Sequence, residues 1–315
     1  MKIVLLESLS VNNDVLHSYV TDLQSKGHTF EAFERTDDSK VLISQTKDAD
    51  VLILANMPLK GEVIRACKNL KFIDIAFTGV DHVDIEAAKE MEIAVSNASG
   101  YSNDSVAEWT LGMMLTLLRN VPQVDKRARE GKTKAGLVGN LLKGKTIGIV
   151  GTGAIGMTTA RLCSAFGCKI IAYNGFSHKQ NTDLVTYLPL KEMLEQSDIV
   201  ALHCPLTDKS RNLINKEAIS YMKSSAILIN AARGGGVNSK DLADALNEGR
   251  IRAAGIDVFE NEPPLDVNHP LLHSKNTIVT PHIAFATEES MEKRAQIVFD
   301  NLKNWIEGRQ INKIC

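Results

Sequence analysis

The sequence predicts an α/β protein built from two doubly wound parallel sheets. Short apolar runs rich in Val and Ile alternate with amphipathic stretches along all 315 residues. Strands that alternate with helices form parallel sheets through βαβ units, and runs that are apolar on both faces suit sheets covered on two sides. The runs fall into two series on either side of a turn-rich segment near residue 100, so we expect two sheets.

The strands of the two series are predicted from these apolar runs. The first series comprises residues 2–6, 29–33, 51–55, 72–76 and 93–95. The second series comprises residues 146–150, 169–173, 199–202, 226–230, 253–258 and 277–280. Between the strands, helical periodicity indicates helices over residues 14–26, 61–67, 155–166, 190–196 and 239–248.

Two longer helical patterns frame the second series. One runs from residue 106 to about residue 129, and Asp104 or Ser105 is expected to cap it. This helix either braces two lobes or is a plain core helix, and both roles are compatible. The other pattern, residues 287–307, is expected to return the chain to the first lobe. We therefore expect one domain from residues 1–100 with 287–315, and a second from residues 101–286.

Composition excludes several classes of function. The apolar fraction of 44% and charged fraction of 23% are ordinary for a soluble globular protein. A net charge of −2 provides no electrostatic footprint for nucleic acid. No apolar run approaches the roughly 20 residues that span a bilayer, and residues 1–6 are too short for a signal peptide. The five cysteines lack the spacing of a disulfide frame or metal site, so we expect a cytoplasmic protein without bound metal.

A glycine-rich turn is the first candidate site. Gly151, Gly153 and Gly156 follow an expected strand and open an expected helix. In this setting the three glycines permit a tight turn, close approach to a pyrophosphate and close helix–strand packing. The helix N-terminus adds N–H groups and a partial positive charge for the anion. The segment predicts a dinucleotide site, the alternative being a βα turn without a ligand.

Asn174 is expected at the position that discriminates between NAD and NADP. An acidic residue at the end of the second strand of such a unit binds the adenosine ribose and repels a 2′-phosphate. Asn174 ends residues 169–173 and cannot repel a phosphate, while Ser177, His178 and Lys179 follow within reach of one. No Arg follows Asn174 directly. We expect NAD, with NADP as the alternative; the other interpretation of residues 177–179 is a solvated loop.

Three further residues suggest acid–base chemistry. Arg233 follows an expected strand and precedes three glycines, which places a carboxylate-binding guanidinium at the ligand edge of a sheet. His282 also ends an expected strand, and Glu262 precedes it by twenty residues. A carboxylate beside a histidine stabilises the imidazolium and forms a proton-handling pair. Taken singly, His282 is typical of a loop histidine, and Glu262 and Arg233 of surface charges.

Together these segments resemble the D-isomer-specific 2-hydroxyacid dehydrogenases, the family that contains phosphoglycerate, glycerate and D-lactate dehydrogenases. The resemblance covers nearly the whole chain. It rests on the order and spacing of segments 78–81, 105–108, 151–156, 202–207, 232–235, 257–260, Glu262-Pro263 and Pro281-His282. It implies two Rossmann-like lobes with a cleft between them, residues 101–286 holding the dinucleotide and the rest forming a substrate domain. It also implies a homodimer.

The resemblance implies roles for individual residues. Arg233, Glu262 and His282 form the catalytic set. The cofactor contacts, to which we add Asn174, are Thr78, Gly151, Thr152, Gly153, Ala154, Ile155, Gly156, His203, Cys204, Pro205, Thr207, Ala231, Arg233, Asp257 and His282. In this scheme Asp257 contacts the nicotinamide carboxamide. For Cys204, a plain buried thiol is the alternative.

The implied reaction is reduction of a small 2-keto acid, or oxidation of the matching D-2-hydroxy acid. Protonated His282 donates to the developing alkoxide while Glu262 orients it, and Arg233 grips the substrate carboxylate. Besides Arg233 and His282, the expected substrate contacts are Asn56, Met57, Gly79 and Val80, partly through backbone N–H groups. Met57, Tyr101 and Phe285 shape the side-chain pocket or serve as core.

Three alternatives share this scaffold. A formate-oxidising relative typically has Gln at the position of Glu262, so Glu262 argues against it. A phosphite-oxidising relative keeps the same three residue types. A nucleotide-sensing corepressor is a different class, but a sensor has no need of the complete set of Arg233, Glu262 and His282.

Overall fold

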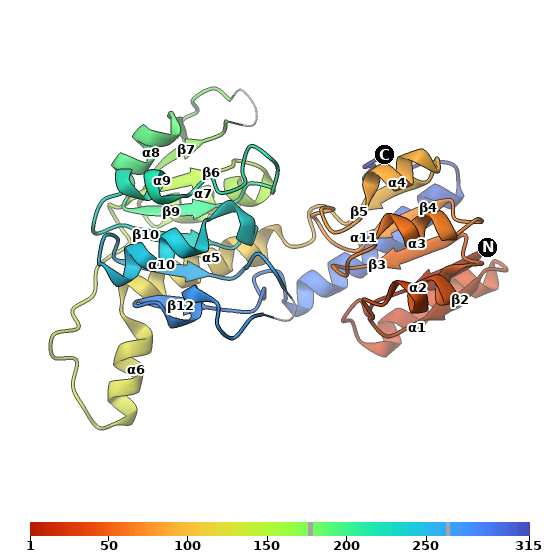
Figure 1. Ribbon diagram of the computed structural model, residues 1–315, viewed down its shortest axis with the longest axis horizontal. Coiled ribbons are helices and arrows are strands. Elements are labelled where there is room, and N and C mark those ends of the chain that lie inside the picture. The colour runs from red at the N-terminus through yellow and green to blue at the C-terminus, as the bar shows by residue number, and fades with distance from the viewer. Residues whose placement is uncertain (176–178, 263–264) are drawn as a thin grey trace. The chain divides into compact units, whose positions relative to one another are not determined.

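The computed structural model describes residues 1–175, 179–262 and 265–315. The chain divides into two compact units, which we call unit 1 (Met1–Ser102 with Ala286–Cys315) and unit 2 (Asn103–Phe285). Each unit is built around its own parallel sheet with helices on both faces (Figure 1). The predicted α/β class with two parallel sheets is confirmed.

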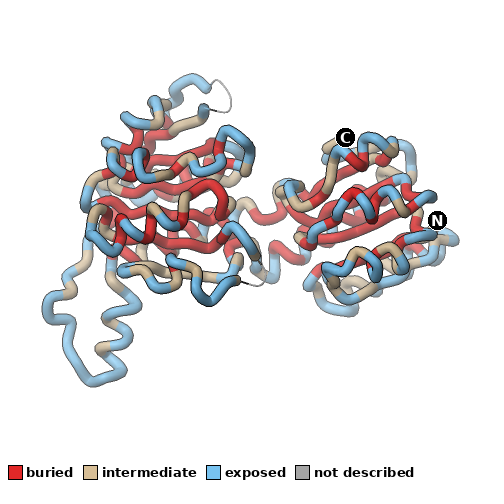
Figure 2. The backbone as a smooth tube through the Cα atoms, in the orientation of Figure 1, coloured by how far each residue is buried: buried red, intermediate tan, exposed pale blue. Residues whose placement is uncertain are grey.

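The sheet of unit 1 has five parallel strands in the order β2-β1-β3-β4-β5. The chain runs from β1 to β2 at one edge of the sheet and then continues from β3 to β5 on the other side of β1, as in other doubly wound sheets. The strands are β1 (Lys2–Leu5), β2 (Thr29–Ala32), β3 (Val51–Leu54), β4 (Phe72–Ile75) and β5 (Ala94–Asn97). Every residue of the inner strands β3 and β4 is buried, because helices cover both of their faces (Figure 2).

Five helices belong to unit 1, and four of them follow a side-chain cap that the sequence analysis did not single out. They are α1 (Asn13–Ser25), α2 (Ser39–Thr46), α3 (Gly61–Ala66), α4 (Ile85–Glu90) and α11 (Glu288–Ile306). Asn12, Asp38, Asp84 and Thr287 accept a backbone N–H at the start of α1, α2, α4 and α11. The predicted return helix is α11, whose Trp305 stacks on Phe72 of β4 at 4.8 Å between ring centroids.

The residues after α11 extend the sheet of unit 1. Ile314 donates its N–H to Val95 O at 2.8 Å, and Val95 donates to Cys315 O at 3.0 Å. Ser96 and Lys313 form an antiparallel bridge. This segment therefore covers the outer edge of β5, which would otherwise present unpaired backbone groups.

The sheet of unit 2 has seven strands in the order β12-β11-β10-β9-β6-β7-β8. The strands are β6 (Thr146–Val150), β7 (Lys169–Tyr173), β8 (Thr186–Tyr187), β9 (Ile199–Leu202), β10 (Ile227–Asn230), β11 (Ala253–Ile256) and β12 (Thr277–Val279). Every pairing is parallel. The chain direction along the sheet reverses between β6 and β9, and ligands of such sheets bind at this switch point.

Helices cover both faces of this sheet, so its side chains alternate between two cores. Ile149 of β6 packs in one core with Met113 of α5 (Asn103–Leu118). Val150 packs in the other core with Met193 of α8 (Leu190–Gln196) and Leu242 of α10 (Ser239–Asn247). The remaining helices and 3-10 turns are α6 (Val121–Arg129), α7 (Ala154–Ala165), α8 (Leu190–Gln196), α9 (Lys216–Tyr221), η1 (Gly234–Gly236), α10 (Ser239–Asn247) and η2 (Pro270–His273).

The long helix expected from residue 106 to about 129 is wrong in two respects. The helix begins at Asn103, so Asp104 and Ser105 lie in its first turn and do not cap it. It also ends at Leu118, and Asn120 in the left-handed region (φ +52°) separates it from α6. Pro122 lies in the first turn of α6, where the missing N–H costs nothing. Helix α6 and the loop after it project from the body of unit 2 and are largely exposed (Figures 1 and 2).

Candidate active site

Each of six strands in unit 2 is followed within three residues of its carboxyl end by a predicted segment. The segments 151–156, 203–207 and 231–233 follow β6, β9 and β10. Asn174 follows β7, residues 257–262 follow β11, and His282 follows β12. Because the carboxyl ends of parallel strands meet at one edge of a sheet, the structure brings these residues to the ligand-binding edge of unit 2.

The glycine turn is shaped by close backbone approaches. Gly151 has φ +92°, and a Cβ there would lie 2.8 Å from the backbone nitrogen of Cys204. A Cβ on Gly156 would lie 2.1 Å from Gly151 O. A Cβ on Gly153 would meet nothing within 4 Å, so this side of the turn is open at the N-terminus of α7. The turn therefore has the space and the N–H groups that a dinucleotide pyrophosphate requires.

Asn174 lies beside a hollow at the end of β7. Its Oδ1 accepts from Thr152 N at 3.5 Å, and Thr152 Oγ1 accepts from the Tyr187 hydroxyl at 3.0 Å. The hollow has a volume of about 310 Å³, and its described lining carries Lys179 but no carboxylate. Ser177, His178 and Pro263, which the sequence analysis named, lie outside the described residues.

The loop after β9 combines a buried imidazole with a buried thiol. Neither ring nitrogen of His203 has a hydrogen-bond partner among the described residues, and burial lowers the pKa of this imidazole to about 4. Burial raises the pKa of the Cys204 thiol to about 11, which favours the interpretation of a plain buried thiol. Ser210, which the sequence analysis missed, fixes the loop by donating to Pro205 O at 2.7 Å and accepting from Thr207 N at 2.7 Å.

A small apolar cluster joins two further predicted cofactor contacts. Ala231 packs with Val106 and Ala284, and Ile155 and Phe285 lie against the three. The first helix of unit 2, the glycine turn and the loop after β12 therefore meet at this cluster. Ala154 is the first residue of α7, directly after the turn.

The glycines after Arg233 permit contact between two loops. A Cβ on Gly234 would lie 2.0 Å from the carbonyl carbon of Phe259, so only glycine fits against this backbone. Asn230 holds the turn by donating from Nδ2 to Arg233 O at 2.9 Å. The loop that carries Arg233 is thus pressed against the loop that carries Glu262.

Glu262 and His282 form a close pair, although they are twenty residues apart in sequence. His282 Nδ1 lies 2.7 Å from Glu262 Oε1, and both side chains are about one-fifth exposed, at 18% and 20%. Phe259 N–H donates to Glu262 Oε2 at 3.3 Å. His282 has φ +55°, and its N–H donates to Asp257 O at 2.7 Å. The carboxylate thus holds one ring nitrogen of an imidazole that solvent can still reach.

Asp257 shapes the loop that carries His282. Its carboxylate is fully buried and accepts from the Thr280 hydroxyl at 2.6 Å and from the N–H groups of Ile283 and Ala284 at 2.9 Å. Burial raises the pKa of this carboxyl, and these donors partly offset the rise. The structure thus gives Asp257 an internal role, while its expected contact with a carboxamide stays a prediction.

The predicted substrate contacts lie at the carboxyl ends of β3 and β4 in unit 1. The N–H groups of Ala55, Asn56 and Met57 all donate to Glu7 Oε2, at 3.0, 2.9 and 3.0 Å. The expectation that the N–H groups of Asn56 and Met57 bind a substrate carboxylate therefore differs from the structure, because Glu7 already occupies them. Met57 is fully buried, as the core interpretation expects.

The turn after β4 carries Thr78, Gly79 and Val80, all of them partly exposed. Asn97 Nδ2 donates to Thr78 O at 2.7 Å and holds the start of this turn. Thr78 Oγ1 is buried without a hydrogen-bond partner in the part of the chain that the structure describes. Tyr101 is 3% exposed and tilts against Phe77.

Comparisons with known proteins agree with this arrangement. Residues 111–284 match the family model described as the D-isomer specific 2-hydroxyacid dehydrogenase, NAD binding domain. A hydroxypyruvate reductase from Blautia hydrogenotrophica is 34% identical over an alignment that covers 100% of the chain and 99% of that protein. The chain belongs to this family.

Two solved structures show how far the fold of these dehydrogenases is shared. An acyclic imino acid reductase in complex with NADPH and D-Arg has a TM-score of 0.91 at 27% identity, and the match covers 100% of both chains. A D-lactate dehydrogenase from Aquifex aeolicus, complexed with NAD and lactic acid, has a TM-score of 0.87 at 30% identity. That match covers 98% of this chain and 96% of the other.

Membership of the family gives the dehydrogenase its reaction type. It is an oxidoreductase that transfers a hydride between a nicotinamide cofactor and a small D-2-hydroxy acid or 2-keto acid. Within the described ranges, no group of three or more His, Cys, Asp and Glu side chains is placed to hold a metal ion. No helix over the same residues is both long and apolar enough to cross a bilayer.

Proposed function

We propose that this dehydrogenase reduces small 2-keto acids, such as hydroxypyruvate and glyoxylate, with Arg233, Glu262 and His282 as its catalytic residues. The observation that carries the proposal is the 2.7 Å contact between His282 Nδ1 and Glu262 Oε1. A carboxylate at one ring nitrogen leaves the other, Nε2, as the proton donor. The printed name of the Blautia relative supports the choice of substrate.

The chain's own residues handle charge and protons in this scheme. When bound, the reduced nicotinamide supplies the hydride to C2 of the keto acid. His282 Nε2 gives its proton to the oxygen on C2 as negative charge develops there, and Glu262 balances the imidazolium before the transfer. Arg233 binds the substrate carboxylate. It is part of the 231–236 turn, and its Nη1 donates to Ala232 O at 2.9 Å.

Unit 2 is proposed to bind the dinucleotide and unit 1 to bind the substrate. The open turn at Gly153 and the N-terminus of α7 would hold the pyrophosphate. The partnerless ring nitrogens of His203 suit a contact with the bound cofactor, which would satisfy a buried polar group. Gly79 and Val80 remain candidates for the substrate carboxylate, since no hydrogen bond from Gly79 N is present among the described residues.

NAD is the proposed cofactor, with NADP as an accepted alternative. The family model is that of an NAD-binding domain. The hollow beside Asn174 contains Lys179 and, in its described lining, no carboxylate that would repel a 2′-phosphate. We therefore expect weaker discrimination against NADPH than an acidic residue at position 174 would produce.

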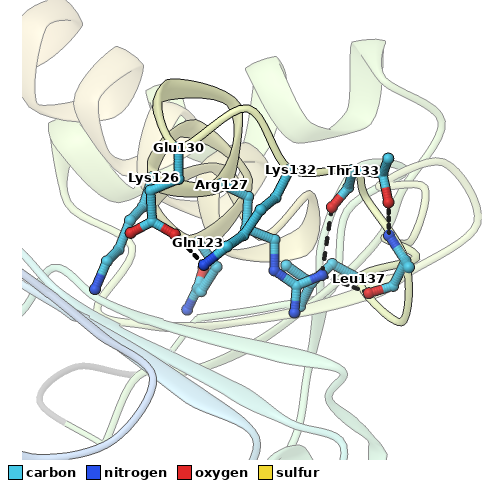
Figure 3. Close-up of a pocket in the computed structure, with 8 residues that line it drawn as sticks. Gln123, Lys126, Arg127, Glu130, Lys132, Thr133 and Leu137 are labelled. Atoms are coloured by element: carbon cyan, nitrogen blue, oxygen red, sulfur yellow. Dashed lines mark hydrogen bonds and ion pairs between the residues drawn. The ribbon is translucent and has the colours of Figure 1, made fainter.

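The projecting arm, α6 with the loop to residue 141, supports the proposal of a homodimer. None of the residues in α6 is buried, and Val138 and Leu141 in the loop are 78% and 72% exposed. Arg127 Nη1 donates to Ala135 O and so ties the loop to the helix (Figure 3). An ordered arm with exposed apolar side chains suits contact with a second copy of the chain.

All five cysteines are free, which supports a cytoplasmic location.

The decisive test is a spectrophotometric assay of the purified protein. NADH or NADPH is mixed with glyoxylate, hydroxypyruvate or pyruvate, and the absorbance of the reduced cofactor is followed. We expect oxidation of the cofactor with at least one acid. His282→Asn should lose about 100-fold or more in kcat while binding NADH as the wild type does, and the exposed His17→Asn is the matched control. Full turnover by His282→Asn would contradict the assigned role.

A further inference from the structure

We infer that Glu260 is a positioning residue for the proposed reaction, and that Ser239 and His269 hold it in place for this. These three residues, which we call the Glu260 cluster, fix the loop from which Glu262 reaches His282. The inference rests on the proposed function, because it concerns the same pair of Glu262 and His282. All five residues belong to unit 2.

The first step concerns the Glu260 carboxylate, both of whose oxygens are bound by side chains from other segments. Ser239, the first residue of α10, donates its hydroxyl to Glu260 Oε1 at 2.5 Å. His269 Nε2 lies 3.0 Å from Glu260 Oε2. Burial raises the pKa of Glu260, but the hydrogen bonds to its carboxylate outweigh this and leave the pKa below its ordinary value. The ionised carboxylate therefore joins α10, the loop after β11 and the start of η2.

The second step concerns the His269 ring, whose orientation is set by another contact. His269 caps η2, and its Nδ1 accepts the N–H of Leu271 at 3.4 Å. A neutral imidazole that accepts at Nδ1 carries its proton on Nε2. His269 therefore donates from Nε2 to Glu260 in its neutral form. Leu271 is buried in a core of unit 2, so the ring is held by a segment that is itself anchored.

The third step connects the same ring to the residue that binds Glu262. The rings of His269 and Phe259 lie edge to face, with 5.0 Å between their centroids. Phe259 N–H donates to Glu262 Oε2 at 3.3 Å, while Glu262 Oε1 lies 2.7 Å from His282 Nδ1. The contacts to Phe259 and Glu260 thus fix the backbone two and three residues before Glu262.

A purely structural role for the Glu260 cluster would be to fasten α10 to η2, and the two roles predict different results. Loss of a fastening lowers the melting temperature and leaves the turnover of each folded molecule unchanged. Loss of a positioning contact lowers kcat in molecules that are fully folded, because a small displacement of catalytic groups slows the reaction strongly. The Glu260 side chain is 37% exposed, which favours the positioning role, since exposed ionic contacts contribute little to stability.

The test compares Glu260→Ala with the wild type in the reduction of glyoxylate and hydroxypyruvate by NADH. We expect kcat to fall about ten-fold, while KM for the keto acid and the dissociation constant of NADH stay within about two-fold. Ser239→Ala and His269→Leu should lower kcat in the same direction. His269→Gln should restore part of it, because the glutamine amide can donate to Glu260 from the place of Nε2.

Two matched controls come from the same elements. Asp244→Ala removes a carboxylate that pairs with Lys240 on the exposed side of α10. His273→Leu removes an exposed imidazole of η2 that contacts Val267 O. Both variants should keep the kcat of the wild type. Ser239→Ala removes a single hydroxyl and provides the same comparison if Glu260→Ala is poorly folded.

Glu262→Gln separates positioning from a structural role. If the Glu260 cluster acts through Glu262, the double variant Glu260→Ala/Glu262→Gln should turn over no more slowly than Glu262→Gln alone. Additive losses would overturn the inference. So would an unchanged kcat in Glu260→Ala, or a fall in kcat that only follows the loss of folded protein measured by circular dichroism.

The outcomes also separate this inference from the proposed function. If Glu262→Gln loses turnover and Glu260→Ala does not, the inference fails and the catalytic assignment stands. If Glu262→Gln turns over like the wild type, or if the wild type reduces neither acid with NADH or NADPH, the proposed function fails and this inference fails with it.

Discussion

Three carboxylates show how differently single residues use burial in this chain. Glu7 accepts four hydrogen bonds, three of them from backbone N–H groups, and Asp257 accepts three. Each carboxylate fixes a loop at the end of a strand. Asp74 in β4 is fully buried but accepts from Asn301 Nδ2 alone, at 2.9 Å. Its Oδ2 is without a partner among the residues described. The hydrogen bonds to Glu7 and Asp257 therefore offset the free-energy cost of burying a carboxylate far better than the single bond to Asp74 does.

Asp74→Asn should stabilise the protein at neutral pH. Burial raises the pKa of Asp74 well above its ordinary value, and the Asn301 bond offsets this only in part. A carboxyl whose pKa is higher in the folded state makes folding less favourable as pH rises above its unfolded pKa of about 3.9. The melting temperatures of variant and wild type should agree near pH 4 and diverge toward pH 7, by about 2–4 °C for each kcal/mol. Equal melting temperatures across this range would contradict the argument.

Asn174→Asp should restrict the enzyme to NADH. An aspartate at the end of β7 would repel a 2′-phosphate and accept hydrogen bonds from the ribose. We expect kcat/KM with NADPH to fall by about ten-fold or more, while the value with NADH changes little. The exposed Asn181→Asp is a control for added charge. A parallel fall with both cofactors would show instead that the Asn174 bond to Thr152 N is needed for the turn itself.

At the scale of elements, the contact between two loops depends on one missing side chain. A Cβ at position 234 would collide with the backbone of Phe259 and Glu260, which cannot swing aside as a flexible side chain can. Gly234→Ala should therefore separate the Arg233 loop from the Glu262 loop. We expect a loss of about 1–3 kcal/mol in the free energy of unfolding and a large loss of kcat. Gly112→Ala in α5, where a Cβ meets nothing within 4 Å, is the control and should be neutral or stabilising.

The arm makes a prediction about assembly. If Val138 and Leu141 contact a second copy, replacing both with Asp buries charge in that contact and should produce a monomer. Light scattering after gel filtration measures the mass, and circular dichroism checks that unit 2 is still folded. The matched control replaces Lys132 and Lys134, exposed residues of the same loop, with Ser. A double-Asp variant that keeps the mass of the wild type would contradict the arm as an interface.

The elements also show what sequence patterns can and cannot predict. Inner strands such as β3, β4, β9 and β10 could be predicted because their apolar runs are buried on both faces. The break at Asn120 was missed because apolar residues continue in helical register past it, although Pro122 was a usable signal. The two-residue strand β8 is too short for periodicity to show. Arg233, Glu262 and His282 could be proposed as one site for another reason. They follow strands of one parallel sheet, and the carboxyl ends of such strands meet at one edge.

The role of Glu7 could not be predicted from local sequence. Its three backbone donors lie 48 to 50 residues away, and only the pairing of β1 with β3 brings them together. Asp257 is a similar case, because its donors come from the loop after the neighbouring strand β12. Such contacts follow from strand order, which the sequence patterns alone left open.

At the scale of the whole molecule, the two units differ in how the chain builds them. Unit 2 is continuous, and its own helices supply both cores of its sheet. Unit 1 needs α11, whose Met291, Val298 and Leu302 are buried and which lies against β4 and β5. Unit 2 therefore contains everything that its sheet requires, whereas residues 1–102 do not.

We expect residues 103–285 to fold as an isolated fragment and to bind NADH, and residues 1–102 to remain unfolded. Thermal melts by circular dichroism and titration with NADH, followed by its fluorescence, measure the two properties. A fragment 103–285 without a cooperative melt would show that its sheet depends on unit 1. A cooperative melt of residues 1–102 would show that α11 is dispensable there.

The insertion of unit 2 between β5 and α11 has a consequence for synthesis on the ribosome. Ser96 donates its hydroxyl to Ile311 O, a partner that is translated 215 residues later. The first hundred residues therefore lack this partner, and the outer edge of β5 stays unpaired, while unit 2 is translated and folds. During that interval the nascent chain exposes an apolar sheet face that α11 will later cover, which makes it a natural client for a chaperone.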